Sequence, residues 1–592
     1  MDTGQSAHYC AHMVFEAFRA YREQFEALTR QARARFEERD WQAVRDIAAR
    51  RLVLYRQVLV STMVRIQRRF ESESRDKWFW AASKAAYRRA VAHRGDAEIG
   101  ETFFNSVTRR ALDTVGVDPR VEFVRAPLHG EDMDADCPGR RVYPCRRLTI
   151  GLFERIVADY GFGRPFEDLR RDARRAAARV EQHLHIMGRL EGLSCVEMLP
   201  RPFVRDKAAY LVGRMQCGPR RVPLILALLN RPAGLVIDAV LLEEDHVSIL
   251  FSYTRASFFV ETDRPRDLVG FLADLIPGKR VSELYTLLGF DKHGKTELYR
   301  EILGHMDGCR APFELSEGER GMVMVVFNSP TDDLVFKIIR DSFDYPKKTT
   351  RQNVMSRYDY VFRHDRAGRL VDAQSFEQLK FHRRCFAPEL LETLRHHAAQ
   401  SVRIDERDVV IRHAYVERRV VPLDVYLRRV DSVQAMRAVI DYGNAIKDLA
   451  VSDIFPGDML LKNFGVTRLN RVVFYDYDEL CALTECRFRS LSEAQGGTAP
   501  GDGPVLERVD ENDIFPEIFR TAMGLAPDLR DVFMRYHGDL LEVDFWRDIQ
   551  RYIRRRKWVH ILPYTEKQRL APAAAGTRVK TAARTAARPQ RR

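Results

Sequence analysis

The sequence predicts an α+β protein in which a mostly helical N-terminal part is followed by a bilobal C-terminal part. Apolar residues recur at helical spacing from Val14 onward, and two short apolar strands joined by a turn occupy Met322–Ile339. Helical patterns dominate again after Leu423. At 592 residues, with 45% hydrophobic and 31% charged residues, the chain is an ordinary globular protein that is too long for one hydrophobic core. We therefore expect at least two domains.

The first third of the chain predicts a helical assembly. Asp40 fits the N-cap of a second helix that runs from Trp41 toward Ile66, and the arginine-rich segment Arg170–Arg179 continues in the same style. The apolar residues of the first helix share one face, which indicates a buried stripe. They are Val14, Phe18, Tyr21, Phe25, Leu28 and Ala32.

The next segment shifts from helical patterns to strands. Val222–Asn230 and Leu235–Leu242 flank an Arg231–Gly234 turn and predict a β-hairpin. His246–Tyr253 and Ser257–Glu261 predict further strands. Helices are predicted to resume at Ser282–Leu288 and Glu297–Leu303.

Four polar residues in the C-terminal part follow a spacing that suits phosphoryl transfer. Asn463 follows Asp458 by five residues, and Asp476 and Asp478 come after a short strand, Arg471–Tyr475. Asp458 can orient or deprotonate an acceptor hydroxyl, while Asn463 and Asp476 offer oxygen ligands to Mg²⁺, with Mn²⁺ as an alternative metal. Asp478 is a further metal candidate. The alternative is a loop whose Asp and Asn side chains only cap turns and helices.

A lysine and a glycine-bearing loop precede this site, as a nucleotide-binding lobe requires. Lys337 lies inside the apolar strand Leu334–Ile339, where an unpaired ammonium would be costly. Pairing with ATP phosphates would explain it; the alternative is a lysine that points outward from an edge strand. The loop reads G-x-x-G rather than G-x-G-x-x-G, which excludes an ordinary eukaryotic-type protein kinase. Its residues expected against the nucleotide are Ser316, Glu317, Gly318, Glu319, Arg320, Gly321 and Met322.

A second stretch, Gly289–Thr296, fits the phosphate-loop pattern G-x-x-x-x-G-K-[ST]. A genuine phosphate loop needs a β-strand leading into it, so that backbone N–H groups wrap the phosphates. The preceding Ser282–Leu288 predicts a helix instead. We therefore interpret this match as a coincidence.

Beyond these spacings, long stretches of the chain resemble the bacterial isocitrate dehydrogenase kinase/phosphatase family. The resemblance spans roughly residues 15–570. It is carried by GETFFNSV (100–107), DKAAYLVGRM (206–215), IPGKRVSELYTLLGFDKHGKTELYREIL (276–303), GERGMVMVVF (318–327), IRHAYVERRVVPL (411–423), YGNAIKDLA (442–450) and IFPGDMLLKNFGVTR (454–468).

The resemblance implies one polypeptide that phosphorylates a serine of isocitrate dehydrogenase with ATP and also removes the phosphate. That switch divides flux between the tricarboxylic acid cycle and the glyoxylate bypass. It further implies a regulatory domain over residues 1–310, with AMP as an effector, and a kinase-like catalytic domain over 311–570, with a small lobe to about 419. No AMP-binding motif is evident in the sequence.

The resemblance also assigns roles that spacing alone does not give. Asp372 matches the aspartate that the family uses in its phosphatase reaction, although its sequence context would otherwise predict a turn or cap. Glu417 leads into Pro422, a segment that resembles the hinge where adenine lies. Independently of the resemblance, the position of Lys462 beside Asn463 predicts that it neutralises charge on the γ-phosphate.

Composition limits the partners and the compartment. The formal net charge is +13, but residues 571–592 carry six basic residues and no acid, which leaves +7 for the rest. This tail predicts disorder, and without interleaved aromatic residues we expect no specific nucleic-acid binding. The nine cysteines lack CxxC pairs, and no apolar run is long enough to span a membrane. We expect reduced thiols, no membrane association and a cytoplasmic protein.

Two other classes of function stay open on the motifs alone. A small-molecule kinase of the aminoglycoside or choline type shares G-D-x-x-x-x-N and D-x-D, but it would not explain the long helical N-terminal part. A non-catalytic, pseudokinase-like regulator would not need the complete set of Lys337, Asp458, Asn463 and Asp476. The glycine- and proline-rich stretch 490–510 predicts a flexible loop that suits contact with a protein substrate, or is a plain insertion.

Overall fold

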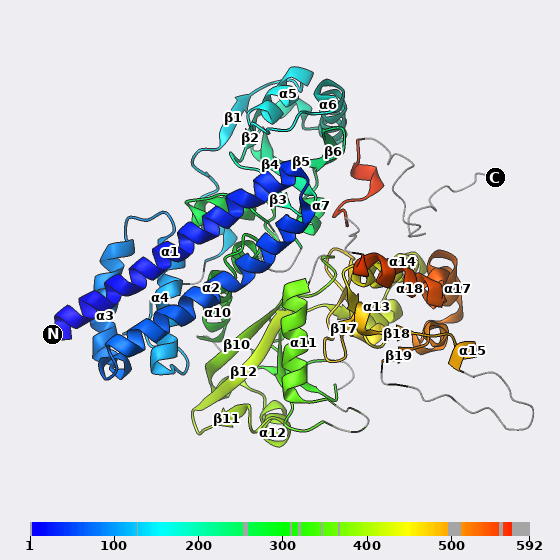
Figure 1. Ribbon diagram of the computed structural model, residues 1–592. Helices are drawn as coiled ribbons and strands as arrows, with labels where there is room; N and C mark the ends of the chain where they lie inside the picture. The colour runs from blue at the N-terminus through cyan, green and yellow to red at the C-terminus, as the bar shows by residue number, and fades with distance from the viewer. Residues whose placement is uncertain are drawn as a thin grey trace, which may run out of the picture.

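The computed structural model describes residues 3–126, 128–252, 258–307, 311–317, 321–343, 345, 347, 349–364, 367–494, 510, 512–555 and 561–570 (Figure 1). It is an α+β protein, as predicted, with a helical N-terminal region and a C-terminal region built around antiparallel sheets. The flexible loop predicted at 490–510 falls largely outside these residues, and the basic tail 571–592 lies wholly outside them.

Two long helices, α1 (Thr3–Glu38) and α2 (Trp41–Arg69), lie side by side at the N-terminus (Figure 1). All six apolar residues of the predicted stripe on α1 are buried, and the Asp40 carboxylate accepts the Ala43 N–H at 3.1 Å as the N-cap of α2. Both predictions are confirmed. Two shorter helices, α3 (Lys77–Val91) and α4 (Ala97–Leu112), complete the bundle.

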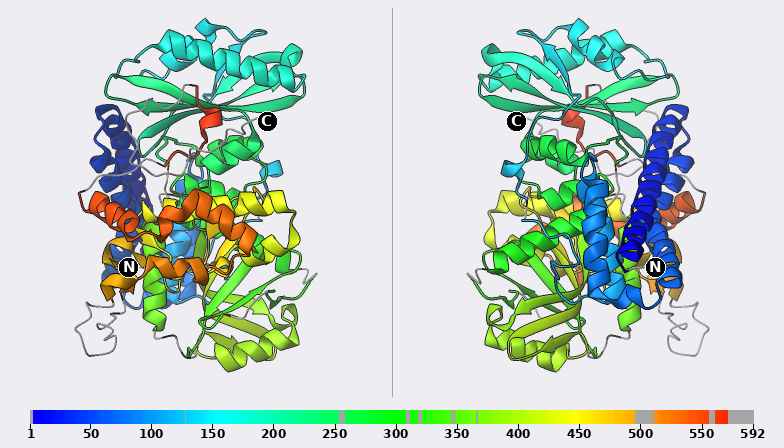
Figure 2. Two further views of the ribbon diagram at one scale, coloured as in Figure 1. Left: turned by 90° about the vertical axis from the view of Figure 1, so that its right-hand side faces the viewer. Right: turned by 90° about the vertical axis from the view of Figure 1, so that its left-hand side faces the viewer.

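A mainly antiparallel sheet follows, in the order β1-β2-β4-β5-β6 with β3 paired to β4. The predicted hairpin is present as β5 and β6, and the predicted helix at 170–179 lies inside α6. Figure 2 shows α5 and α6 on the outer face of this sheet. The elements are β1 (Arg141–Pro144), α5 (Ile150–Ala158), α6 (Leu169–Ile186), β2 (Leu193–Met198), β3 (Phe203–Arg205), β4 (Ala208–Cys217), β5 (Arg220–Asn230) and β6 (Leu235–Leu241).

The strand predicted at His246–Tyr253 is wrong, because Glu244–Leu250 forms helix α7. Its buried Val247 and Leu250 are three residues apart, and Glu244 and Asp245 in the first turn favour the positive end of the helix dipole. Of the strand predicted at Ser257–Glu261, Ser257 lies outside the described residues, and among residues 258–261 Phe259 makes an isolated antiparallel bridge to Val204. The predicted helices after it are present as α9 (Val281–Leu287) and within α10 (Asp291–Asp307), preceded by α8 (Pro265–Leu275).

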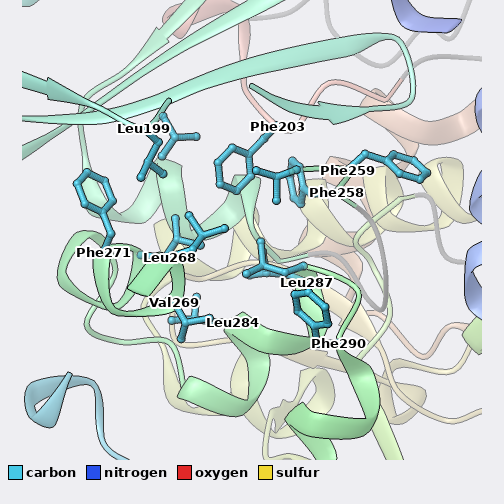
Figure 3. Packing of buried hydrophobic residues seen from close by; sticks show 14 of the residues in the cluster. Leu199, Phe203, Phe258, Phe259, Leu268, Val269, Phe271, Leu284, Leu287 and Phe290 are labelled. Carbon is cyan, nitrogen blue, oxygen red and sulfur yellow. The ribbon is translucent and has the colours of Figure 1, made fainter. Parts of the chain in front are cut away.

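A continuous apolar core joins the sheet to these later helices. Figure 3 shows Phe203 of β3 and Phe258 in one cluster with Leu268 of α8, Leu284 of α9 and Phe290 of the turn after α9, and all five side chains are buried. This packing fixes α8 and α9 against the N-terminal sheet, while Leu298 and Ile302 of α10 pack in the core of the first C-terminal lobe.

The first C-terminal lobe is an antiparallel sheet in the order β10-β12-β9-β8-β7, with β11 on β12. The strands predicted at 322–327 and 334–339 are present as β8 and β9, and the segment that leads through Glu417 into the predicted hinge is strand β12. The polar region 345–387 contains a helix and a strand that we did not predict, α11 and β10. The elements are β7 (Glu314–Leu315), β8 (Met324–Asn328), β9 (Leu334–Ile339), α11 (Arg351–His364), β10 (Ala373–His382), α12 (Pro388–His397), β11 (Val402–Ile404) and β12 (Asp408–Arg418).

The second lobe is mainly helical after Leu423, as predicted, and it packs around Tyr442, Phe464, Phe474 and Trp546. A three-stranded sheet in the order β13-β15-β16 includes the end of the predicted hinge segment, Val421–Pro422, as β13. The principal elements are β13 (Val421–Pro422), α13 (Leu423–Arg429), α14 (Ser432–Ala450), β14 (Ile454–Phe455), β15 (Phe464–Val466), β16 (Val472–Phe474), β17 (Cys481–Ala482), β18 (Arg487–Phe488), α15 (Leu491–Ala494), β19 (Asp513–Ile514), α16 (Phe519–Ala522), α17 (Pro527–His537) and α18 (Val543–Arg554).

Ion pairs tie the N-terminal region to the hinge side of the first lobe. Arg418, at the end of β12, lies 3.2 Å from Glu283 and 2.8 Å from Asp333, and Arg280 lies 2.8 Å from Asp332. The strand that leads into the hinge is thereby held by residues of α9 and its N-terminal turn.

The end of the described chain returns to the N-terminal sheet (Figure 2). Tyr564 is buried in the core of that region, and its hydroxyl donates to Asp238 at 3.1 Å. Arg569 also pairs with Asp238, at 2.9 Å. The segment after the second lobe therefore straps the two regions together.

Seven cysteines within the described part of the chain are free, but Cys385 is disulfide-bonded. The prediction of reduced thiols throughout is wrong at that position, because cysteine spacing does not reveal which thiols meet in the fold. Among the described helices, none combines the length and the hydropathy that a membrane span needs.

Candidate active site

Lys337 connects the first lobe to the second. Its strand, β9, lies between β8 and β12, so the alternative of an edge-strand lysine pointing outward is wrong. The side chain is buried; its Nζ lies 2.6 Å from Glu417 Oε1 and donates to the Tyr475 carbonyl oxygen at 2.8 Å. Since Tyr475 immediately precedes Asp476, this one side chain joins both lobes at the predicted site.

Glu417 is the buried counter-ion of Lys337. Burial raises the pKa of its carboxyl and Asp372 raises it further, while Lys337 opposes both effects. Glu417 Oε2 is buried without a hydrogen-bond partner among the described residues. The structure therefore pairs the predicted hinge glutamate with Lys337, and its contact with a nucleotide stays a prediction.

Hydrogen bonds fix both ends of the loop Asp453–Asn463. Asp453 adopts a left-handed φ of 64°, and its carboxylate accepts the Thr484 N–H at 2.9 Å and the Thr484 hydroxyl at 3.2 Å. The Asn463 amide nitrogen donates to the Asp458 carboxylate. The predicted base and the predicted metal ligand are therefore neighbours.

A glycine allows this loop to pass close to the next acidic segment. Gly457 has a φ of 90°, and a Cβ there would lie 2.7 Å from Glu479 Cβ and 2.8 Å from its carbonyl oxygen. Glu479, which the sequence reading overlooked, also affects Asp458 electrostatically. Burial and then the charge of Glu479 raise the pKa of Asp458 to about 6, against the lowering effect of the Leu460 N–H and Lys347.

The register between β15 and β16 brings Asp476 next to Asn463. β16 pairs with β15 so that Phe474 lies opposite Phe464, and the Tyr475 N–H donates to the Asn463 carbonyl at 3.2 Å. Asp476, one residue further, therefore emerges beside Asn463. The turn and the strand β16, which separate Asn463 from Asp476 in the sequence, fold these two residues together.

Asp476 and Asp478 share a hydrogen bond. Burial and that hydrogen bond raise the pKa of Asp476 well above its usual value; burial also acts on Asp478, but the bond and Lys347 leave its pKa lowered. Two crowded carboxylates and the Asn463 amide oxygen are the hard oxygen donors that Mg²⁺ prefers. The residues fit this ion, which would replace the proton that the two carboxylates share.

Lys347 is a further residue of the site, and no sequence pattern predicts it. Its Nζ lies 3.5 Å from Asp478 Oδ2 and also contacts Glu479. Lys462, by contrast, is exposed in a short 3-10 turn beside Asn463, and its carbonyl oxygen accepts the Tyr475 hydroxyl. The predicted role of Lys462 at the γ-phosphate stays a prediction.

Asp372 is brought to the site by a pairing between distant segments. The Phe474 N–H donates to the Arg369 carbonyl at 2.7 Å, the Val371 N–H donates to the Phe474 carbonyl at 3.2 Å, and the Tyr477 hydroxyl donates to the Val371 carbonyl at 2.6 Å. Asp372 therefore leaves this pairing next to the strand that delivers Asp476. Gln374 donates to its Oδ2 at 2.8 Å.

Arg369 anchors that pairing, and the sequence reading missed it. The buried guanidinium makes two 2.8 Å hydrogen bonds to Asp441, one at 2.9 Å to Asp448 and one at 3.0 Å to the Val472 carbonyl. Asp441 in turn accepts the Val472 N–H at 2.8 Å. One arginine thus fixes both partners of the pairing to helix α14.

The predicted phosphate loop is only partly described. Gly318, Glu319 and Arg320 lie outside the described residues. Ser316 donates its hydroxyl to Asn328 at 2.7 Å, while Glu317, Gly321 and Met322 are exposed around the gap. Contact between this loop and a nucleotide stays a prediction.

The second phosphate-loop pattern follows a helix rather than a strand, as predicted. Helix α9 leads into it, Gly289 makes the turn with a φ of 93°, and Gly294 lies inside α10. A Cβ at Gly294 would lie 2.5 Å from the Ser282 carbonyl oxygen, so this glycine serves close packing of two helices. Within the described residues 258–307, no strand leads into the pattern that could aim backbone N–H groups at a phosphate.

Comparison with known families agrees with this architecture. The family model of the isocitrate dehydrogenase kinase/phosphatase (AceK) regulatory domain matches residues 11–310, and that of the kinase domain matches residues 311–566. The chain belongs to the isocitrate dehydrogenase kinase/phosphatase family. It accordingly has a regulatory and a kinase part, and a kinase domain implies ATP and, in general, a divalent metal.

Curated relatives extend over nearly the whole chain. The proteins named isocitrate dehydrogenase kinase/phosphatase in Anaeromyxobacter sp. (strain Fw109-5) and Anaeromyxobacter dehalogenans (strain 2CP-C) are 46% and 45% identical to it, over 95% and 97% of this chain and 97% and 99% of their own. The one in Xanthomonas campestris pv. campestris (strain 8004) is 40% identical over 94% of this chain and 96% of its own. These comparisons give no support to a small-molecule kinase.

Proposed function

We propose that this protein phosphorylates a serine of isocitrate dehydrogenase with ATP, removes that phosphate again, and so switches flux between the tricarboxylic acid cycle and the glyoxylate bypass. The observation that carries the proposal is the assembly of Lys337, Asp458, Asn463 and Asp476 at one junction of two lobes, in a chain of this family. A pseudokinase-like regulator would not need this complete set.

In the kinase reaction, Lys337 binds the phosphates of ATP, and Glu417 holds its ammonium group in place through their ion pair. Asp458 orients the substrate serine and accepts its proton, held by the Asn463 amide. Asn463 and Asp476 hold Mg²⁺, with Asp478 as a further ligand and Mn²⁺ as an alternative metal. The bound ion supplies charge neutralisation at the transferred phosphoryl group. Lys462 contributes a further positive charge there.

The phosphatase reaction uses the same pocket. Asp372 directly follows the segment Arg369–Val371, which pairs with β16, and its charge raises the pKa of the Glu417 carboxyl. We assign it the task of orienting and deprotonating the water that attacks phosphoserine, with Gln374 fixing its carboxylate. The family resemblance motivates this role, and the buried surroundings of Glu417 and Asp476 are consistent with it.

The remaining assignments rest on the family and on sequence patterns. Residues 1–310 act as the regulatory domain with AMP as effector, and residues 311–570 as the catalytic domain. Ser316 to Met322 cover the nucleotide phosphates. The protein acts in the cytoplasm, without a specific nucleic-acid or membrane partner.

Incubation with isocitrate dehydrogenase and ATP labelled on the γ-phosphate tests the proposal. We expect Mg²⁺-dependent label on a serine of the substrate, followed by release of label as inorganic phosphate once free labelled ATP is removed. Phosphorylation of small alcohols in preference to the protein would favour a small-molecule kinase. Absence of any Mg²⁺-dependent ATP turnover would favour the pseudokinase alternative.

A further inference from the structure

Two free thiols face each other immediately behind the active-site loop. Cys481 lies in β17 and Cys486 follows a single 3-10 turn, and their Sγ atoms are 3.5 Å apart. Cys486 is buried, whereas Cys481 is partly exposed, so one thiol of the pair is open to a small reagent. We propose that Cys481 and Cys486 form an oxidisable dithiol whose disulfide lowers both activities of the enzyme.

The chemistry of the pair suits attack by Cys481. The hydrogen bond with Cys486 lowers the pKa of the Cys481 thiol, burial opposes this, and Arg357 assists it. The Cys481 thiolate attacks one oxygen of a hydroperoxide; the O–O bond breaks, and the leaving oxygen departs as water or an alcohol after protonation. The Cys486 sulfur then attacks the resulting sulfenic acid and loses its proton, hydroxide leaves as water, and the S–S bond forms. Two thiols are oxidised for each peroxide reduced.

The turn between the thiols is held firmly on the Cys486 side. Gln550 on α18 donates to the carbonyl oxygens of both Leu483 and Cys486, each at 2.7 Å. A disulfide requires the sulfurs to approach to about 2.05 Å, so they must close by roughly 1.5 Å. Because Cys486 is anchored, much of that movement falls on Cys481 and β17.

Strand β17 is tied directly to the loop that carries Asp458. Cys481 pairs with Phe455 of β14, and Thr484 binds the Asp453 carboxylate through both its N–H and its hydroxyl. On the other side, Cys481 follows Glu479 by two residues. A shift of about 1 Å in reacting groups can cost on the order of 10²-fold in rate. We expect oxidation to reduce phosphorylation and dephosphorylation by at least about tenfold.

The full-length enzyme treated with hydrogen peroxide tests this, with one peptide as the readout. Cleavage after Arg471 and Arg487 leaves both cysteines in the single peptide Val472–Arg487. We expect this peptide to become lighter by two hydrogens and to lose both alkylation sites as activity falls. Dithiothreitol should restore the peptide and the activity; dithiothreitol without peroxide measures any effect of reducing Cys385.

Variants separate this pair from general oxidation. Cys481→Ser and, at the buried position, Cys486→Ala should keep normal activity before peroxide and resist inactivation afterwards. Cys195→Ser removes another partly exposed thiol, in the N-terminal sheet, and should remain as sensitive as the unaltered enzyme. A peptide that still accepts two alkyl groups after inactivation would overturn the proposal. So would disulfide formation that leaves both activities unchanged.

Discussion

The two segments that meet at the active site reach it in different ways. The catalytic loop, Asp453–Glu479, carries its functional residues along one stretch of chain, and a local hairpin, β15–β16, folds Asn463 against Asp476. The aspartate segment, Arg369–Asp372, lies about a hundred residues earlier and arrives only by pairing with β16. The comparison shows that the geometry of a contiguous motif can be predicted from its spacing in the sequence. The position of a residue that depends on long-range strand pairing cannot be predicted in this way.

The largest effect should come from breaking the catalytic loop itself. Asp476→Ala removes an oxygen ligand that both reactions need, so we expect phosphorylation and dephosphorylation of isocitrate dehydrogenase each to fall by about 10³-fold or more. Lys337→Met should likewise lose both. Initial rates measured with labelled substrate check this, with Asp528→Ala on the exposed start of α17 as the control. A variant that keeps full phosphatase activity without nucleotide would contradict a shared pocket.

Breaking the aspartate segment at its functional end should separate the two activities. A positioned general base contributes about 10²–10⁴-fold, so Asp372→Ala should lower dephosphorylation by that order. Phosphorylation should stay within about tenfold, and isocitrate dehydrogenase mixed with this variant and ATP should accumulate in the phosphorylated form.

The exposed Asp405→Ala, on the turn before β12, is the control for Asp372→Ala and should leave both rates unchanged. Equal loss of both rates in Asp372→Ala, with ATP affinity intact, would instead show that Asp372 supports the whole site. The assignment of the aspartate segment to dephosphorylation alone would then be wrong.

Breaking the anchor of the aspartate segment should act on stability before chemistry. Arg369→Met removes the buried counter-charge of Asp441 and Asp448, two carboxylates that are each about a quarter exposed, which should cost roughly 1–3 kcal/mol of unfolding free energy. Arg369→Lys keeps the charge but not the paired hydrogen bonds, so its loss should be smaller. Denaturant unfolding followed by far-ultraviolet circular dichroism measures both. An Arg369→Met variant as stable as the parent would show that the carboxylates find other partners.

The sequence predicted the residues of the contiguous catalytic loop better than the residues that long-range contacts bring to the site. The spacing of Asp458, Asn463 and Asp476 was sufficient because a turn and one short strand fix their geometry, and Lys337 stood out as a charge in an apolar strand. Lys347 and Arg369 carried no such signal, because their partners are distant carboxylates. Helix α11 was missed although its buried Val354, Tyr358 and Val361 have helical spacing, since charged residues dominate the stretch between them.

The smallest effect should come from changing the second phosphate-loop pattern, Gly289–Thr296, which follows a helix instead of a strand. Lys295 completes the second phosphate-loop pattern, yet it lies on helix α10 with its Nζ 5.0 Å from the centre of the Phe376 ring. This contact between the N-terminal region and β10 is worth on the order of 0.5–1 kcal/mol. Lys295→Ala should therefore leave the dissociation constant for ATP within about twofold while lowering stability slightly; Lys295→Arg, which keeps a cation over the ring, should recover the stability. Titration calorimetry with ATP and denaturant unfolding measure the two effects. Abolished ATP binding in Lys295→Ala, with the fold intact, would mean that the motif works without a strand and that Lys337 is not the phosphate-binding lysine.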